Sequence, residues 1–284
     1  MLFLKKIFRD LKILPLFFKN LNFKSFILFL RYPFLIRRTI VQLGAKYTTS
    51  DNKLIMTINE NNLSFHINSI CNITAIIEIF YEKVYKVNTS QKCIAIDVGM
   101  NIGAASAFFA LMPNVSKVYA FEPFTETFKQ ALFNINRNPL IKEKIMALNY
   151  GLSNKNETIS VPFSFDDSIA MSTTKESIDQ LNSAIGKMQS VNIQLRSVSE
   201  VLSEIFNENT ENKAIILKID CEGAEYEILE SLDKNKLLSN IDFIIIEWHI
   251  KGEHELLKIL EKYGFISFSR LIYYGLGLIY AVRK

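Results

Sequence analysis

Short apolar runs of strand length alternate with longer amphipathic segments through most of the chain. The central example extends from Cys93 to Glu122, where an apolar run at 93–96 precedes a glycine-containing loop. An apolar, small-residue segment at 102–112 follows, and Pro113 ends it as it would end a helix. A second apolar run then leads to Glu122. This order of strand, loop, helix, strand and acid predicts the first half of a nucleotide-binding α/β unit.

Similar patterns lie on both sides of this unit. Upstream, they predict a β-hairpin over 53–58 and 63–67 and an amphipathic helix over 73–85. The elements expected downstream are helices at 125–135, 198–206, 223–232 and 253–263, and strands at 145–152, 159–165, 191–195, 214–219, 241–246, 265–269 and 278–282. The polar, Ser- and Thr-rich stretch Asp166–Gln189 is expected to form a loop over the site.

Four polar residues fall where predicted strands end: Asp97, Glu122, Asp220 and His249. Alternating strands and helices predict a doubly wound sheet, which binds its ligands beyond the carboxyl ends of the strands. We therefore expect a single site at this edge. The alternative is that each residue only caps a helix or holds a loop.

The loop after the first of these strands has the form Asp97-x-Gly99-x-Asn101-x-Gly103. It lacks the Gly-x-Gly-x-x-Gly pattern that admits a pyrophosphate, which favours an adenosine ligand without phosphate. S-adenosylmethionine is such a ligand: its carboxylate could bind the loop N–H groups, and its ribose diol could bind Glu122, nineteen positions after Gly103. Alternatively, two glycines can occur in any buried strand-to-helix turn.

The N-terminus stands apart because its charge is concentrated. Residues 1–40 hold nine Lys or Arg against Asp10, giving +8, so the rest of the chain carries −4 of the total of +4. Its charge-free apolar runs at 13–18 and 25–30 are far shorter than the roughly 20 residues that span a bilayer. Two interpretations stay open, an amphipathic anchor on an anionic membrane surface and a helix packed on the body.

The whole chain has a globular composition, with 49% hydrophobic and 22% charged residues. A basic head on a mildly acidic body does not indicate a nucleic-acid binder. Three cysteines, Cys71, Cys93 and Cys221, lie in or beside apolar runs without disulfide or metal spacing. These features favour a cytoplasmic protein, with a possible peripheral position on the inner face of the membrane.

Five motifs carry a resemblance to a known family. In order they are IDVGMNIGAASAFFA, VYAFEP, LNYGLSN, ILKIDCEGAEYEIL and FIIIEWH, and together they resemble the FkbM-type methyltransferases. The resemblance covers roughly residues 85–247 and is most specific at Lys218-Ile219-Asp220-x-Glu222-Gly223-x-Glu225. Met100 stands where the family more often has alanine, and residues 1–45 lie outside the resemblance.

The resemblance implies a Rossmann-like class I methyltransferase sheet, mostly parallel with an antiparallel strand near the C-terminus. It also implies S-adenosylmethionine as cofactor and methyl transfer to a hydroxyl group, often of a sugar or polyketide. We expect a helical extension at 1–45, a lead-in at 46–92 and the methyltransferase domain at 93–284. The expected cofactor-binding residues are Asp97, Gly99, Asn101, Gly103, Glu122 and Leu152.

A sugar hydroxyl is a poor nucleophile, so a general base is expected beside it. Asp220 and Glu222 are candidates on the turn after the strand at 214–219, and His249 is the other candidate. These three are the predicted catalytic residues, acting on a small-molecule or glycan acceptor. These three residues and Glu247 could also form a metal site. Carboxylates on different turns more often bind helix ends or Lys and Arg, so no metal is predicted.

Two other classes of function stay open from the sequence. One is an NAD(P)-dependent epimerase or reductase, which Asn101 disfavours because it replaces a glycine that admits phosphate. The other is a non-catalytic, membrane-peripheral protein that keeps the fold.

Overall fold

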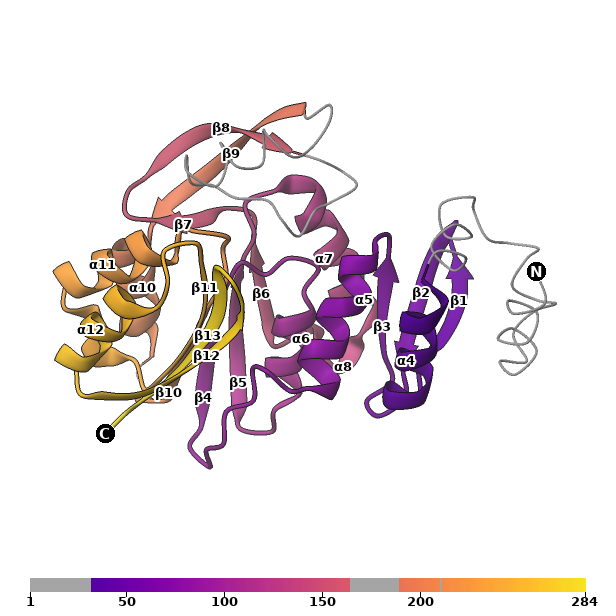
Figure 1. The fold of residues 1–284 in the computed structure, drawn as a ribbon, viewed down its shortest axis with the longest axis horizontal. Helices are drawn as coiled ribbons and strands as arrows, with labels where there is room; N and C mark the ends of the chain where they lie inside the picture. Colours follow the sequence, from indigo (N-terminus) through magenta and orange to yellow (C-terminus); the bar gives the residue numbers. More distant parts are fainter. Residues whose placement is uncertain (1–31, 164–188, 210) are drawn as a thin grey trace. The chain divides into compact units, whose positions relative to one another are not determined.

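The computed structural model describes residues 32–163, 189–209 and 211–284 (Figure 1). Residues 1–31 and nearly all of the predicted loop Asp166–Gln189 lie outside this range. The chain divides into two compact units. The first contains the described residues up to Val84 together with Phe133–Pro139, and the second contains Tyr85–Leu132 and Leu140–Lys284.

The first unit is built on a three-stranded antiparallel sheet in the order β1-β2-β3. Its elements are α4 (Pro33–Leu43), β1 (Lys46–Ser50), β2 (Lys53–Ile58), β3 (Leu63–Ile67), α5 (Ile70–Ile76) and the π-helical turn η1 (Ile77–Tyr81). The predicted hairpin is confirmed as β2 and β3. Strand β1 was missed because its polar residues show no run of apolar positions.

The helix expected over 73–85 has different limits. It begins at Ile70, because the Ser69 side chain accepts the N–H of Asn72 and caps the first turn. It widens into the π-helical turn and ends at Tyr81, so Tyr85 lies beyond it.

The second unit holds the larger sheet. Its elements are β4 (Cys93–Val98), α6 (Ala104–Leu111), β5 (Val115–Phe121), α7 (Thr125–Arg137), α8 (Pro139–Lys142), β6 (Ile145–Leu148), β7 (Gly151–Ser153), β8 (Glu157–Phe163), β9 (Gln189–Ser197), α10 (Val198–Glu208), β10 (Ala214–Ile219), α11 (Glu225–Lys234), the 3₁₀ turn η2 (Leu237–Asn240), β11 (Phe243–His249), α12 (His254–Lys262), β12 (Phe265–Tyr273) and β13 (Leu276–Arg283). Helix α7 continues into the segment that clusters with the first unit.

The seven strands of this sheet have the order β12-β13-β11-β10-β4-β5-β6. Strands β11, β10, β4, β5 and β6 run parallel, and β13 pairs antiparallel with both β11 and β12. The expected Rossmann-like sheet, mostly parallel with antiparallel strands at the C-terminus, is therefore confirmed. Helices α10, α11 and α12 lie along one side of it, and α6 lies on the other (Figure 1).

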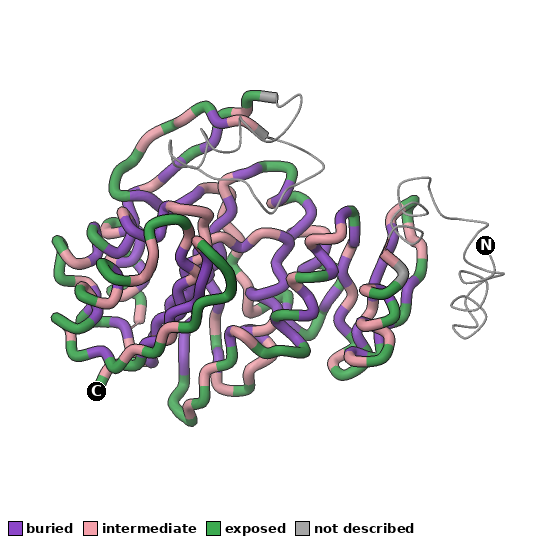
Figure 2. Tube along the Cα trace, in the orientation of Figure 1, coloured by how far each residue is buried: buried purple, intermediate pink, exposed green. Residues whose placement is uncertain are grey.

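The central strands are the most buried part of this unit. Every residue of β4 and β10 is buried, as expected for parallel strands covered on both faces (Figure 2). Leu202, Leu229 and Leu260, from α10, α11 and α12, pack into the same apolar cluster as Ile96, Leu217 and Ile244 from the strands.

The single strand expected at 145–152 is wrong. The chain forms β6 in the large sheet and then β7 in a separate sheet of order β7-β9-β8. The side chain of Asn149 donates to the backbone carbonyls of Glu122 and Pro123, 2.9 and 3.3 Å away, and turns the chain off the first sheet. At Gly151, a Cβ atom would lie 2.7 Å from Leu195, so the glycine lets β9 approach.

Two helix starts also differ from expectation, for the same reason. Helix α6 begins at Ala104 because Gly103 adopts a left-handed conformation with φ of 84°. Helix α11 begins at Glu225 because Glu222 and Gly223 both have positive φ, 55° and 114°. Both loops follow the carboxyl ends of parallel strands, β4 and β10, where the sequence predicts the site.

Within the described part of the chain, no helix combines the length and apolar character needed to cross a membrane.

Candidate functional site

The register of the parallel strands places the ends of β4, β5 and β10 at the same height in the sheet, next to Ile246 of β11. Val98 pairs with Ile219 and with Phe121, and Ile219 pairs with Ile246. The residues that follow these four positions are Gly99, Asp220, Glu122 and Glu247. They therefore lie at one level near the carboxyl edge of the sheet, where Gly99, Asp220 and Glu122 leave the sheet and β11 continues through Glu247 to His249. Asp97, which was expected at this edge, instead lies inside β4, in register with Lys218 and Ala120.

The loop after β4 is closely packed against the turn after β10. Gly99 has a φ of 82°, and a Cβ atom there would collide with the backbone carbonyl oxygen of Asp220. Glycine is required at this position for both reasons. The predicted cofactor loop and the predicted catalytic turn are therefore neighbours within one unit.

The N–H groups of this loop are largely used inside the protein. Those of Gly99 and Met100 donate to the carbonyl of Phe121 at 3.1 and 2.8 Å, and that of Gly103 donates to Met100 at 3.0 Å. The expectation that a carboxylate binds these loop N–H groups is wrong for these three atoms. The N–H groups of the first turn of α6 follow the loop directly and have no acceptor within the helix, so we expect them to be the donors for a carboxylate.

Glu122 lies directly beyond β5 and is 5% exposed. One carboxylate oxygen accepts the N–H of Asn101 at 2.9 Å, and the other accepts the N–H of Phe124 at 3.0 Å. Burial raises the pKa of Glu122 to about 7, although these two backbone donors and the charge of Lys218 act to lower it. Each oxygen keeps a lone pair for a further donor, such as a ribose hydroxyl.

Asp97 and Leu152, two other predicted cofactor residues, are buried. Asp97 accepts the hydroxyl of Ser106 at 2.5 Å and pairs with Lys218 Nζ at 2.9 Å, so it holds the base of the loop. Leu152, in β7, is 3% exposed and packs in the apolar cluster. Direct contact of either residue with a cofactor stays a prediction.

Lys218, a buried residue of β10, connects the loop after β4 with the turn after β10. Its side chain is 2% exposed, and Nζ lies 2.9 Å from Asp97, 3.5 Å from Asp220 and 2.7 Å from the carbonyl oxygen of Gly99. Burial alone would lower the pKa of Lys218, but the charges of Asp97 and Asp220 outweigh burial and raise it. The ammonium therefore stays charged and ties β10 to the loop.

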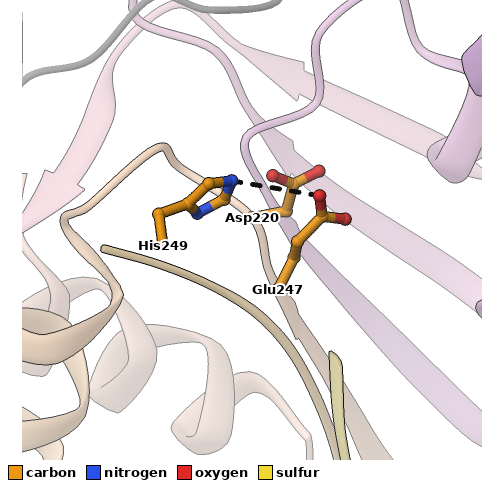
Figure 3. Close-up of side chains that lie close together, drawn as sticks. All are labelled: Asp220, Glu247 and His249. Atoms are coloured by element: carbon orange, nitrogen blue, oxygen red, sulfur yellow. Dashed lines mark ion pairs between the residues drawn. The ribbon is translucent and has the colours of Figure 1, made fainter. Parts of the chain in front are cut away.

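Asp220, directly after β10, lies close to Glu247 and His249 near the end of strand β11 (Figure 3). The hydroxyl of Tyr85 lies 3.2 Å from Asp220 Oδ2 and 3.4 Å from Glu247 Oε2. Burial, followed by the charge of Asp220, raises the pKa of Glu247 to about 8, against the opposing charges of His249 and Lys218. The pKa of Tyr85 is also well above its usual value, because its hydroxyl is buried beside these carboxylates.

His249 is held between three glutamates. Its Nδ1 lies 3.2 Å from Glu225 Oε1, and its Nε2 lies 3.5 Å from Glu222 Oε2 and 3.9 Å from Glu247 Oε1. Burial alone would lower the pKa of His249, but the hydrogen bond to Glu225 and the surrounding negative charges raise it to about 10. Burial raises the pKa of Glu222 to about 7, partly offset by His249.

The predicted catalytic residues Asp220, Glu222 and His249 thus come together, and Glu247 joins them. One donor atom from each of Asp220, Glu247 and His249 lies within 4.8 Å of the others, a spacing that could hold a metal ion. Tyr85 and Lys218 already act on these carboxylates.

Three residues of this site received no role from the sequence: Tyr85, Lys218 and Glu225. Lys218 carried a signal, because a lysine inside the apolar strand AIILKI needs a buried partner. Tyr85 was expected only as the last residue of the helix over 73–85. Glu225 is 0% exposed and lies three, four and seven positions before Ile228, Leu229 and Leu232, on the buried face of α11. This helical spacing is a signal that could have marked it as a buried acid.

Trp248, between Glu247 and His249 in β11, is too buried to stack on a sugar ring. Trp248 is 3% exposed and fills space next to Gly277, where a Cβ atom would lie 2.5 Å from its ring. His66 in β3 and His254 at the start of α12 are not among the residues of this site.

Comparison with known proteins agrees with this arrangement. The Methyltransferase FkbM domain family matches residues 97–267. Methyltransferase sdnD of Sordaria araneosa is 25% identical over 211 residues, covering 66% of this chain and 80% of sdnD. Methyltransferase 1 of Beauveria bassiana (strain ARSEF 2860) is 28% identical over 203 residues, covering 66% of this chain and 78% of its own.

Among solved structures, methyltransferase FkbM from Methylobacillus flagellatus KT superposes with a TM-score of 0.45 at 10% identity. The match covers 89% of this chain and 59% of that chain. TrmK of M. capricolum, solved in complex with S-adenosylhomocysteine, has a TM-score of 0.41 at 12% identity. That match covers 72% of this chain and 66% of the TrmK chain.

The family match, over residues 97–267, spans more than half of the chain. The protein belongs to the FkbM methyltransferase family. It is an S-adenosylmethionine-dependent methyltransferase with a Rossmann-like sheet, and the resemblance noted in the sequence is confirmed.

Proposed function

We propose that the protein transfers the methyl group of S-adenosylmethionine to a hydroxyl oxygen, on a sugar of a glycan or a glycan precursor. The observation that carries this proposal is the group of carboxylates packed against the cofactor loop. Glu222 and Glu247 have pKa values raised to about 7 and about 8 by burial and by like charge. Carboxylates with such values are suited to remove a hydroxyl proton near neutral pH.

The chain has groups that fit the cofactor. Asn101 Oδ1 is buried with no hydrogen-bond partner among the described residues, as expected of an acceptor that a bound molecule satisfies. Glu122 offers acceptor positions beside it. When bound, the cofactor supplies an electrophilic methyl group on a sulfonium. Asn101 and Glu122 would hold the nucleoside, and Gly99 would let this part of the loop stay close to the turn of Asp220.

The acceptor is expected on the Asp220 side of that contact. Asp220, Glu222 and Glu247 can orient its hydroxyl and remove its proton, while Lys218 and Tyr85 fix the carboxylates. Methyl transfer needs the oxygen in line with the breaking bond, so placement of this hydroxyl accounts for much of the expected rate enhancement.

The test is methyl transfer from labelled S-adenosylmethionine to a panel of glycans, nucleotide sugars and lipid-linked sugars. Matched acceptors would carry the hydroxyl, an amine or a methoxy group at the same carbon. O-methylated sugar as the product supports the proposal. Exclusive labelling of the amine acceptors would contradict it, because an amine needs no base of this kind.

We also propose that residues 1–40 hold the enzyme at an anionic membrane surface, as their charge of +8 and interleaved apolar residues indicate. The structure changes how this should be tested. Ile36 is 1% exposed and Thr39 is fully buried, so α4 is part of the first unit and should be kept. A chain starting at Tyr32 should lose salt-sensitive binding to anionic liposomes and keep its melting temperature. Equal liposome binding by both chains would refute the proposal.

A further inference from the structure

Glu225, the first residue of α11, is an unusual buried acid. Its side chain is 0% exposed. Oε2 accepts the N–H of Gly223 at 2.8 Å, and Oε1 accepts the backbone N–H of His249 at 2.6 Å. The same Oε1 lies 3.2 Å from Nδ1 of the His249 ring. One carboxylate therefore binds both the main chain and the ring of His249.

The rest of His249 is equally constrained. The hydroxyl of Tyr226 donates to its backbone carbonyl at 2.9 Å. Nε2, the other ring nitrogen, lies 3.5 Å from a carboxylate oxygen of Glu222. It also lies 3.9 Å from an oxygen of Glu247, the ion pair drawn in Figure 3. Ionised carboxylates only accept hydrogen bonds, so this geometry is satisfied when both ring nitrogens carry a proton.

We propose that Glu225 is a positioning residue for methyl transfer: it holds the His249 ring doubly protonated, with Nε2–H directed at Glu222 and Glu247, so that a carboxylate and not the imidazole takes the proton of the acceptor. This inference rests on the function proposed above. It gives His249 the role of a fixed cation, where the sequence made it a candidate base.

The step balances. The acceptor O–H proton passes to the carboxylate, and the oxygen forms a bond to the methyl carbon. The carbon–sulfur bond breaks with its electron pair going to sulfur, which leaves a neutral thioether. The protonated His249 gains and loses nothing in this step, and it stabilises the carboxylate as an anion before the proton arrives.

Several titratable groups surround His249 and influence how strongly it holds its proton. Glu225 and Tyr226 face it from α11, Glu222 from the turn before α11, and Glu247 from β11. Asp220 lies across the cluster and pairs with Lys218. Because acids outnumber bases here, removing one of them should lower the affinity of His249 for its proton.

The protonation of His249 can be measured without knowing the acceptor. The chain has three histidines, so ¹⁵N-histidine spectra of the full-length protein can be assigned with the variants His66→Gln and His254→Gln. We expect the His249 ring of the wild type to be doubly protonated at pH 7. A neutral ring at pH 7 would overturn the proposal, and this outcome requires no variant at Glu225.

The variant Glu225→Gln keeps the size of the side chain and removes its charge. We expect the midpoint of the His249 titration to fall by at least about one pH unit, since the nearest opposite charge is lost. With an identified acceptor, kcat should fall at least about tenfold, while KM for S-adenosylmethionine stays within about twofold. An unchanged titration midpoint in the folded variant would contradict the proposal.

The matched control is Glu227→Gln, the same change two residues along α11. Glu227 accepts the hydroxyl of Ser153 at 2.9 Å and lies outside the site. It should leave the His249 spectrum unchanged, whereas an equal shift in both variants would mean a general effect on α11 and would refute a specific role for Glu225.

A bound metal ion is a further outcome that would overturn the proposal. If Mn²⁺ at low concentration broadens the His249 Nε2 signal selectively and a chelator restores it, His249 is a ligand together with Asp220 and Glu247. If no acceptor is ever methylated, the proposed function fails, but the spectrum still decides the state of His249. The two failures can therefore be told apart.

Discussion

The two halves of the site hold buried acids in different ways. Beside the cofactor loop, Glu122 receives one backbone N–H on each oxygen, and Asp97 is paired with Lys218 and Ser106. Asp220 and Glu222 after β10 and Glu247 near the end of β11 form the second group, which has Tyr85 and His249 as donors. The first arrangement fixes a shape for binding. The second gathers like charges, which is how proteins obtain carboxylates that exchange protons near neutral pH.

Lys218 should produce the largest effect because it serves both halves. In Lys218→Met, Asp97 would remain buried without its cation, and loss of one partner of a buried pair costs about 3–5 kcal/mol. We expect a strong fall in the free energy of unfolding, measured by urea titration, and loss of cofactor binding. Lys117→Met is the control, because the Lys117–Glu208 pair is exposed and should contribute less than about 1 kcal/mol. Similar losses in the two variants would contradict the connecting role of Lys218.

Glu247→Gln should separate the halves most clearly. Removing a general base typically lowers turnover by about 10²–10⁴ fold, while the cofactor half keeps its contacts. We expect kcat to fall and the Kd for S-adenosylmethionine, measured by calorimetry, to stay within about twofold. Glu222→Gln and Asp220→Asn, compared in the same assay, show which carboxylate takes the proton.

The control for these variants is Asp242→Asn. Asp242 lies at the opposite end of β11 and pairs with Arg283 at 3.0 Å. It should change turnover little. If Asp242→Asn slows the reaction as much as Glu247→Gln, the loss reflects β11 as a whole and not the base.

Glu122→Ala should act on the other half of the site and weaken the binding of S-adenosylmethionine. A hydrogen bond to a charged group contributes about 1.5–3 kcal/mol, so we expect at least about a tenfold rise in Kd. Because burial raises the pKa of Glu122 to about 7, affinity should also fall as the pH drops below 7 and the carboxylate takes a proton. Glu126→Ala, an exposed acid on α7, is the control. Unchanged affinity in a folded Glu122→Ala protein would remove Glu122 from the cofactor site.

Stability should depend on pH through His249. Its pKa is raised from 6.5 in the unfolded chain to about 10 in the folded protein. The stabilisation is therefore complete below pH 6.5 and is lost as the pH rises toward 10. We expect the difference in unfolding free energy between wild type and His249→Gln to shrink by about 1 kcal/mol or more between pH 6.5 and 10. A difference that is constant over this range would show that His249 keeps an ordinary pKa when folded.

The two halves also differ in how well the sequence predicted them. The loop after β4 follows from spacing within one strand–loop–helix–strand unit, so Gly99, Asn101, Gly103 and Glu122 could be predicted as cofactor-binding residues from the motif alone, and their contact with the cofactor stays a prediction. The acceptor half depends on contacts between distant segments. Tyr85 lies 135 residues from Asp220 along the chain, and Glu225 lies 24 residues from His249. The spacing of apolar and polar residues predicts which face of an element is buried, but it does not predict which distant side chains will be in contact.

The same limit explains the errors in the fold. Strands β4, β10 and β11 were predicted because buried parallel strands are continuous apolar runs. The break between β6 and β7 was missed because it depends on Asn149 binding the carbonyl of Glu122, a contact across the site that no local pattern encodes.

Tyr85→Phe should give the smallest effect and the finest test of the comparison, because the hydroxyl touches only the acceptor half. It donates toward Asp220 and Glu247 at 3.2 and 3.4 Å, and a hydrogen bond to their ionised forms favours those forms. Without it, the pKa of the base should rise further, so at pH 7 a smaller fraction is ionised. We expect kcat to fall by about 2–10 fold at pH 7, matching about 0.5–1.5 kcal/mol, and to recover toward the wild-type value at pH 9. Cofactor affinity should stay unchanged at both values of pH. A loss of the same size at pH 7 and pH 9 would mean that Tyr85 acts by packing and not by tuning the carboxylates.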